Sequence, residues 1–417
     1  MKRFGTLGQW LWWGALVGVA CGIASAVFLL LLDVVTHVRM HDERFIYALP
    51  LAGLVIGLVS ERFGAPIKAG NNLIIDTIHD DGPEVPLRMA PMVLLGTVSA
   101  HLFGASVGRE GTAVQMGASL TDWLSHRLRL GPELRLQLLA AGVAGGFGSV
   151  FGTPIAGAIF GLEFIVLGRL KYEALVPALV AAVIGDMTTR ALGVTHARYP
   201  VVAHLDLSPV LVGKWVVFAG AIAAVTAVFI ELVHFLKKHG EQRLPRLPLR
   251  MFLGGLVVVG LWKLVGSQDY LGLGVPTILR AFEDPALPVT MFALKLLFTA
   301  VSLGAGFPGG EVTPLFFVGA ALGSVLAQIL GIPVALGAGV GLAAVFAAAS
   351  NAPLALSVMA VELLGVGVFP HVVIVAVIAY VLTGHRGIYS SQRMVMLKSG
   401  HPVTRSTSLK AHADSGE

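Results

Sequence analysis

The stretch that decides the fold of this chain runs from Gly104 to Gly117 and reads Gly-Ala-Ser-Val-Gly-Arg-Glu-Gly-Thr-Ala-Val-Gln-Met-Gly. It lies between two strongly apolar segments, so Arg109 and Glu110 fall at or near membrane depth, where a charge costs on the order of 3 kcal/mol or more. Its glycines disfavour one continuous spanning helix. They favour a backbone that breaks, exposes its N–H groups and restarts as a helix after Gly108.

A helix that begins inside a bilayer points unpaired N–H groups and a positive dipole end at whatever lies before it. Anions bind at such ends, and broken helices of this kind mark the transport sites of many carriers. A structural ion pair between Arg109 and Glu110 at the membrane interface is the alternative, and these residues alone leave it open.

Composition places the chain in the membrane. Of its 417 residues, 56% are hydrophobic and 13% are charged, which predicts an all-α polytopic membrane protein in a lipid bilayer. The single Cys21 excludes an intramolecular disulfide and a zinc cluster. We find no nucleic-acid module, cofactor motif or metal-ligand spacing, so no cofactor, metal or nucleic-acid partner is expected.

Apolar segments recur along the whole chain, and several are too short to span a bilayer unbroken. The first runs from Trp10 to Leu32, which is the length of a spanning helix and too long for a signal peptide. The short segments suggest tilted or interrupted helices that meet inside the protein. Basic residues at Lys2-Arg3, in Lys237–Arg250 and in Arg386–Lys410 favour cytoplasmic termini, following the positive-inside rule.

The chain repeats itself. Pro154-Ile155-Ala156 recurs as Pro353-Leu354-Ala355, and Gly108-x-Glu110-x-Thr112 recurs at nearly the same offset as Gly309-x-Glu311-x-Thr313. A weaker pair, Gly70-x-x-x-Ile74 and Gly274-x-x-x-Ile278, follows the same order. Two homologous halves, often inverted in topology, place a transporter's site where their broken helices converge at the midplane. We therefore expect one repeat over residues 1–200, a second over 201–396 and a short polar cytoplasmic tail over 397–417.

Two further glutamates, Glu163 and Glu362, lie in apolar runs at matching positions of the two repeats. The matching positions favour a structural role, whereas carboxylates inside a membrane can also carry protons. The sequence leaves both roles open.

Four stretches resemble the motifs of the CLC family of anion channels and transporters over roughly residues 10–393. Gly108–Thr112 is similar to that family's GREGP motif, with threonine in place of its proline, and Gly309–Pro314 is similar to its GxFxP motif. Gly70–Ile74 lies where the family carries GSGIP, and Ile388–Ser390 matches the segment that supplies its central tyrosine. The resemblance implies a homodimer in which each subunit has its own pore.

Three departures from the family pattern resemble its bacterial fluoride/proton antiporter branch. Asn71 replaces the serine that contacts the central anion, and Phe164 stands where chloride/proton exchangers carry an internal glutamate. Glu311 stands where those exchangers have an aliphatic residue. The resemblance therefore implies fluoride and protons as substrates and a bacterial inner-membrane location, with a chloride/proton antiporter or a passive anion channel as the alternatives.

The resemblance also assigns the site. Glu110 is expected to gate the pore and transfer the proton, because its carboxylate can compete with the anion for the same donors. Glu311 and Thr313 are expected beside the pore, with Glu311 bonded to Thr313 or to a neighbouring hydroxyl. The residues expected to bind or face the anion are Asn71, Gly108, Arg109, Gly111, Val312 and Tyr389.

Alternatives remain at two of these positions. Asn71 has a side chain suited to capping the short helix that follows it, and Glu311 could merely cap its own helix. A membrane-embedded enzyme would need Glu110 to act with one of the 13 histidines. His101 is nine residues before Glu110, and no His-Glu pair has metal-ligand spacing, so no enzyme is expected.

Overall fold

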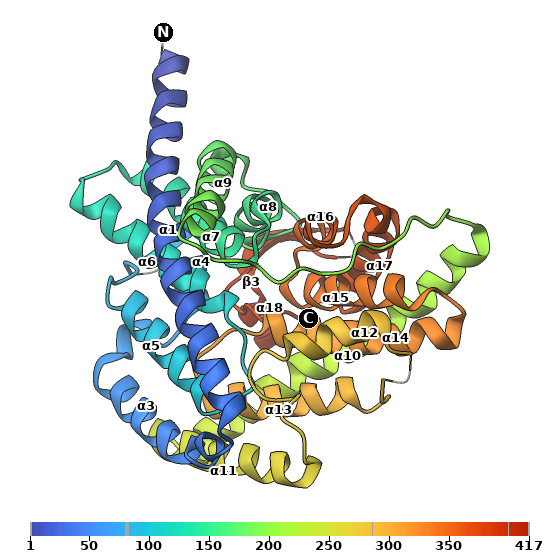
Figure 1. Cartoon of the computed structure of the whole chain (residues 1–417). Helices are drawn as coiled ribbons and strands as arrows, with labels where there is room; N and C mark the ends of the chain where they lie inside the picture. The colour runs from blue at the N-terminus through green and yellow to red at the C-terminus, as the bar shows by residue number, and fades with distance from the viewer. Residues whose placement is uncertain (1, 80–82, 286, 399, 416–417) are drawn as a thin grey trace.

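The apolar segments of the sequence form helices throughout the computed structural model, which describes residues 2–79, 83–285, 287–398 and 400–415 (Figure 1). Within these residues, helices long and apolar enough to cross a membrane are Thr6–His41, Pro132–Phe151, Tyr172–Ala191, Pro209–Arg243, Leu247–Val265 and Val312–Leu330. Shorter apolar helices lie between them. The prediction of a mostly helical, multi-pass membrane protein is confirmed.

The first half of the chain supplies nine α-helices and a two-residue strand within the described residues. Their bounds are α1 Lys2–His41, α2 Arg44–Tyr47, α3 Leu49–Phe63, α4 Asn71–Ile78, α5 Met89–Leu102, α6 Glu110–Arg127, α7 Pro132–Phe151, α8 Pro154–Glu163, β1 Val166–Leu167 and α9 Leu175–Ala191. Helices α7 and α8 begin with proline, whose fixed φ suits the first turn, where its missing N–H would have no helical partner.

The second half supplies the remaining described helices and two more strands. Their bounds are α10 Pro209–Arg243, α11 Leu247–Val265, α12 Val275–Glu283, α13 Met291–Ala305, α14 Val312–Leu330, α15 Val334–Ser350, α16 Pro353–Leu364, α17 Phe369–Leu382, β2 Arg393–Met396, β3 Pro402–Ser408 and α18 Leu409–Ser415. Helices α11 and α14 end at glycines in the left-handed conformation, Gly266 at φ 72° and Gly331 at φ 60°.

Close glycine contacts pack the helices that carry the predicted motifs. Helix α6 packs on α7, and any side chain at Gly117 would overlap the carbonyl of Gly142. In the second half α14 packs on α15, and a side chain at Gly319 would overlap the carbonyl of Gly341 in the same way. Small residues let these backbones approach closely, which holds the beginnings of α6 and α14 in the interior.

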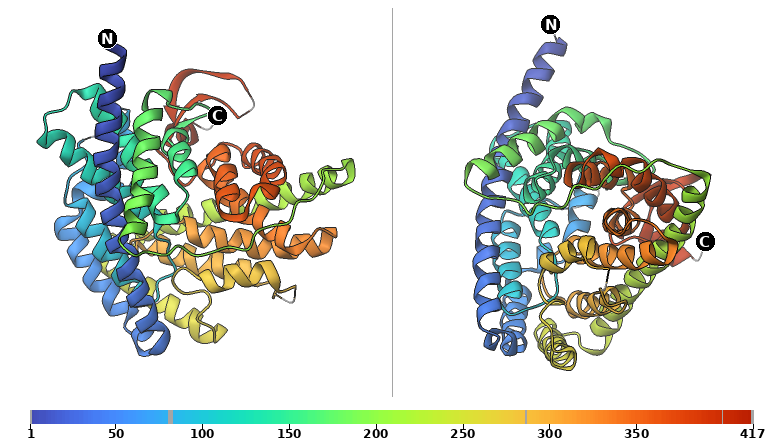
Figure 2. Two further views of the ribbon diagram at one scale, coloured as in Figure 1. Left: turned by 45° about the horizontal axis from the view of Figure 1, so that its top comes forward. Right: turned by 45° about the vertical axis from the view of Figure 1, so that its right-hand side comes forward.

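The C-terminal residues return to the first half of the chain. Strand β2 pairs in parallel with β1, with Val166 opposite Arg393, and antiparallel with β3 (Figure 2). The Leu409 N–H donates to the carbonyl of Gln392, and the Leu409 side chain is buried. The expected polar tail after Met396 therefore includes a strand and a helix that pack on the membrane-spanning part, which polarity alone did not indicate.

Candidate functional site

The carboxylate of Glu110 lies where two helices begin. Glu110 is the first residue of α6 and is completely buried. Its Oε2 accepts the backbone N–H of Thr313, at the beginning of α14, at 3.2 Å and the N–H of Arg109 at 3.1 Å. The Thr313 hydroxyl donates to Oε1. A negative group is thus bound by backbone N–H groups from both halves of the chain, and the dipoles of two helix N-termini favour it.

A backbone bridge joins the two motif loops in front of these helices. Gly108 and Gly310 exchange two hydrogen bonds as an isolated antiparallel bridge, with Gly310 donating to the Gly108 carbonyl at 2.8 Å. A Cβ atom at Gly310 would lie 2.7 Å from the Gly111 nitrogen, and one at Gly108 would lie 2.8 Å from the Gly310 carbonyl oxygen. Only glycine permits this approach, so these glycines set the distance between the beginnings of α6 and α14.

Arg109 forms an ion pair with the residue that follows it. Its Nε lies 3.4 Å from Glu110 Oε1, and its side chain is 17% exposed. The structure therefore contains the charged pair considered from the sequence, but it lies at the meeting point of two helix N-termini. The pair joins the two residues of the turn at which α6 begins.

Asn71 lies beside the beginning of α6. Helix α4 begins at Asn71, and its N-cap residue is Gly70, whose φ is 58° and which has no side chain to cap the helix. The amide nitrogen of Asn71 would lie 3.4 Å from a Cβ atom at Gly111. Its amide oxygen is buried and has no hydrogen-bond partner among the described residues. The side chain is thus directed toward α6 and does not cap its own helix.

Tyr389, which the sequence resemblance assigned to the anion site, lies near the two acidic residues of the motifs. Its side chain is buried, and its hydroxyl is within electrostatic range of Glu110 and Glu311. The N–H of Ser391 donates to Asn72 Oδ1 at 3.0 Å, which fixes the tyrosine loop to α4. In the sequence, the two adjacent asparagines at the start of a short helix were the feature that could have indicated this hydrogen bond.

Phe164 and Gln392 support the same loop. The Phe164 ring packs edge to face on Tyr389, with ring centroids 5.7 Å apart. The completely buried Gln392 donates to the carbonyls of Phe164 at 2.7 Å and Ser350 at 2.8 Å. Residue 164 thus serves as a packing surface for Tyr389. No pattern in the sequence marked Gln392.

Glu311 differs from the expectation in one contact. It precedes Val312, the buried first residue of α14, and its own side chain is partly buried. Glu311 was expected to bond to Thr313 or to a neighbouring hydroxyl, but the Thr313 hydroxyl donates its only proton to Glu110. The expected hydrogen bond from Thr313 to Glu311 is therefore wrong, because the Glu110 carboxylate lies between the two helix starts and takes that donor.

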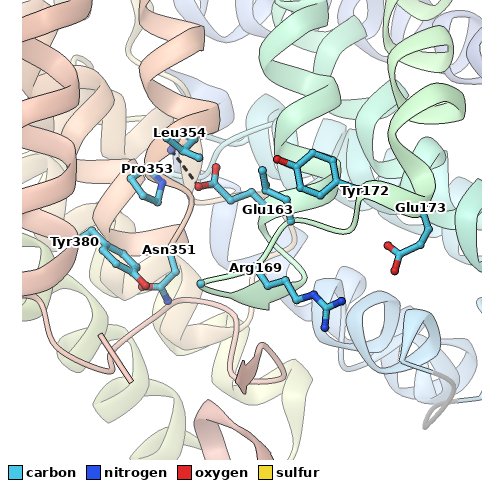
Figure 3. A pocket seen from close by; sticks show the side chains of 10 residues that line it. Glu163, Arg169, Tyr172, Glu173, Asn351, Pro353, Leu354 and Tyr380 are labelled. Atoms are coloured by element: carbon cyan, nitrogen blue, oxygen red, sulfur yellow. Dashed lines mark hydrogen bonds between the residues drawn. The ribbon is translucent and has the colours of Figure 1, made fainter. Parts of the chain in front are cut away.

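A cavity of about 540 Å³ lies away from this site, between β1 and the α15–α16 junction. Figure 3 shows Glu163 at its wall, where the carboxylate accepts the N–H of Leu354 at 3.0 Å. Other lining residues are Arg169, Tyr172, Asn351 and Tyr380. Among the described residues, no group of three or more His, Cys, Asp or Glu side chains is arranged to hold a metal ion.

Comparison with known proteins gives a consistent family assignment. The family model described as "Voltage gated chloride channel" matches residues 52–384. A protein of Pseudomonas syringae pv. tomato named "Chloride/fluoride channel protein" is 47% identical over 406 residues, which are 95% of this chain and 89% of that protein.

Solved structures agree with this sequence relationship. A crystal structure of a CLC-type fluoride/proton antiporter superposes with a TM-score of 0.90 at 32% identity and covers 94% of this chain and 99% of that chain. A slow cyanobacterial Cl⁻/H⁺ antiporter has a TM-score of 0.79 at 19% identity, which shows a shared fold alone.

Proposed function

The chain belongs to the voltage-gated chloride channel (CLC) family, and on that premise we propose that it exchanges fluoride for protons across a membrane. Each subunit exports fluoride, and protons move the opposite way. No covalent chemistry is needed, so the protein is a secondary active transporter and not an enzyme.

The observation that carries this proposal is the bound Glu110 carboxylate. It accepts from the N–H groups of Arg109 and Thr313 and from the Thr313 hydroxyl, all of which are donors that an anion would use. The deprotonated carboxylate and an anion therefore compete for the same place. When Glu110 takes up a proton, its side chain becomes neutral and accepts weaker hydrogen bonds from these donors. The anion can then replace it. Proton uptake and anion binding become linked.

Fluoride is favoured as the anion for two reasons. It is small and strongly hydrated, so a site must replace its water with strong donors, and Asn71 adds an amide beside the helix starts. A relative 47% identical to this chain is named a chloride/fluoride channel protein, and a CLC-type fluoride/proton antiporter shares the fold at 32% identity. A chloride/proton antiporter remains the competing assignment.

We place the protein in a bacterial inner membrane as a homodimer with cytoplasmic termini. Several apolar side chains on α9, α16 and the α17 region are exposed in the isolated chain, including Met187 at 58%, Leu354 at 47% and Val366 at 78%. A second subunit or lipid would cover apolar side chains of this kind. Cross-linking in proteoliposomes, with cysteines placed at Met187, tests the dimer directly.

Flux measurements test the function. Purified protein in proteoliposomes loaded with fluoride is expected to release it and to take up protons at the same time. Chloride-loaded vesicles are expected to show slower release. Fluoride release without proton movement would indicate a passive channel, and equal coupling with chloride would indicate a chloride/proton antiporter.

A further inference from the structure

Two cationic side chains are buried away from the Glu110 site. Arg39, near the end of α1, is 4% exposed, and Lys295 in α13 is completely buried. The Nε and Nη1 atoms of Arg39 have no hydrogen-bond partner among the described residues. Burying a charge without a partner is strongly unfavourable, and buried cations in proteins are normally paired.

Both cations converge on one backbone segment. Lys295 Nζ donates to the carbonyls of Tyr270 at 3.1 Å and Gly272 at 2.6 Å. A Cβ atom at Gly272 would lie 3.1 Å from Arg39 Nη2 and 3.7 Å from His101 Cδ2. Helices α1, α5 and α13 therefore bring three side chains, Arg39, His101 and Lys295, around Gly272.

His101 leaves a further polar atom unused at this place. Its Nδ1 lies 2.8 Å from the Thr97 carbonyl and therefore donates to it. Its Nε2, which is therefore an acceptor in the neutral ring, is buried and has no hydrogen-bond partner among the described residues. His101 Nε2 and the two nitrogens of Arg39 are thus three buried polar atoms without a partner in one small region. Buried polar groups in proteins normally have a hydrogen-bond partner.

The nearby carboxylates have other partners. Asp269 interacts electrostatically with Lys295, but its carboxylate lies 3.8 Å from Arg280 and accepts the Thr277 hydroxyl at 3.2 Å. No carboxylate of the described residues forms an ion pair with Arg39 or Lys295. Within the described residues, Arg39 therefore has no carboxylate in ion-pair contact, and Asp269 acts on Lys295 only at longer range.

The cluster adjoins the loop that leads to Glu110. The Gly272 N–H donates to the Ala105 carbonyl at 3.2 Å, and a Cβ atom at Gly104 would lie 3.6 Å from Arg39 Cδ. Residues 104–109 run from this contact to the first residue of α6. The cluster is thus connected to Glu110 by a short loop. It uses none of the donors that bind the Glu110 carboxylate.

We propose that Arg39 and Lys295, beside His101, form a second anion-binding site for a small monovalent anion. A guanidinium and an ammonium supply the charge, and the free nitrogens of Arg39 supply charge-assisted hydrogen bonds. The site rests on the proposed function and extends it. Residues 104–109 connect fluoride bound here to the donors for which Glu110 competes.

Counting bound anions tests this site. Isothermal titration with sodium fluoride uses Glu110→Gln protein, in which no charged carboxylate competes at the inner donors. Two fluoride ions per subunit are expected. Adding Arg39→Gln is expected to weaken one of them by about tenfold or more, since charge-assisted bonds are lost. Arg44→Gln is the matched control, because its arginine lies nearby on α2 and its side chain is 92% exposed.

Further variants keep the outcome clear. If Arg39→Gln fails to fold, Arg39→Lys keeps the charge with fewer donors and is expected to weaken the same ion by a smaller factor. An unchanged number and affinity of bound fluoride ions in the Arg39 variant would overturn the inference while leaving transport untouched. Conversely, Arg39-dependent binding of fluoride or chloride, without coupled flux in the wild type, would support this site and reject the proposed function.

Discussion

Glu163 and Glu362 each hold the beginning of a helix in the other half of the chain. The Glu163 carboxylate accepts the N–H groups of Leu354 and Ala355 at 3.0 and 2.7 Å (Figure 3). Glu362 accepts those of Ile155 and Ala156 at 3.0 and 2.8 Å. The two glutamates stand at matching positions of the predicted repeat, and each satisfies N–H groups that lack a helical partner.

These reciprocal hydrogen bonds favour the structural role considered for Glu163 and Glu362. We expect Glu163→Gln and Glu362→Gln to retain coupled fluoride and proton flux but to lower stability by about 1–3 kcal/mol each, because a charged acceptor at a helix N-terminus is lost. The loss should be larger at Glu163, which is only 7% exposed. Thermal unfolding in detergent measures it. Proton flux that disappears in the folded Glu163 variant would instead assign that residue to a proton path.

Glu110→Gln tests the gate. The amide cannot release a proton and does not compete as a charge, so proton movement should fall to the level of empty vesicles. Fluoride release should either stop or continue without protons. Glu133→Gln, on the exposed first turn of α7, is the matched control and should behave as the wild type. Fluoride-driven proton uptake that persists in Glu110→Gln would exclude Glu110 as the carrier.

Asn71→Ala tests the added amide. The side chain lies beside Gly111 and caps no helix, so its loss should weaken fluoride transport with little effect on stability. A rise of about tenfold in the fluoride concentration for half-maximal flux is expected from the loss of one hydrogen bond to a charged partner. Unaltered transport, together with a lower unfolding temperature, would show that Asn71 serves only the fold.

Glu311→Gln tests the second acidic residue of the motifs. Tyr389 is within electrostatic range of both Glu311 and Glu110, and the Thr313 hydroxyl is committed to Glu110. Two carboxylates near one anion site repel each other, so removing one charge should alter the ratio of fluoride to protons. Wild-type fluxes of both ions would show that the Glu311 carboxylate takes no part in the coupling.

Gly310→Ala tests the bridge that joins the motif loops. The new Cβ atom would lie 2.7 Å from the Gly111 nitrogen, so the backbone must move and the beginnings of α6 and α14 must separate. We expect a loss of about 1–3 kcal/mol in stability and the loss of transport. Gly260→Ala, where nothing lies within 4 Å of the added atom, should be neutral or slightly stabilising. Normal transport by folded Gly310→Ala protein would refute this role.

Much of the fold could be predicted from the sequence, because hydropathy and glycine placement act locally. Apolar segments must become helices in a bilayer, since each backbone N–H and C=O needs a partner there. The glycines around Gly108 predicted a helix that restarts after that residue inside the membrane, and α6 does begin at Glu110. The correspondence of Glu110 with Glu311, and of Glu163 with Glu362, was also present in the sequence.

Only the tertiary structure decided which partner each of these groups takes. Thr313 binds Glu110 and not Glu311, because the Gly108–Gly310 bridge brings the beginnings of α6 and α14 together. Such contacts join residues about two hundred positions apart, and no local pattern encodes their distance. The same holds for Arg39 and Lys295, which are ordinary basic residues in the sequence. Packing alone placed both side chains in one buried region where no carboxylate of the described residues lies in ion-pair contact.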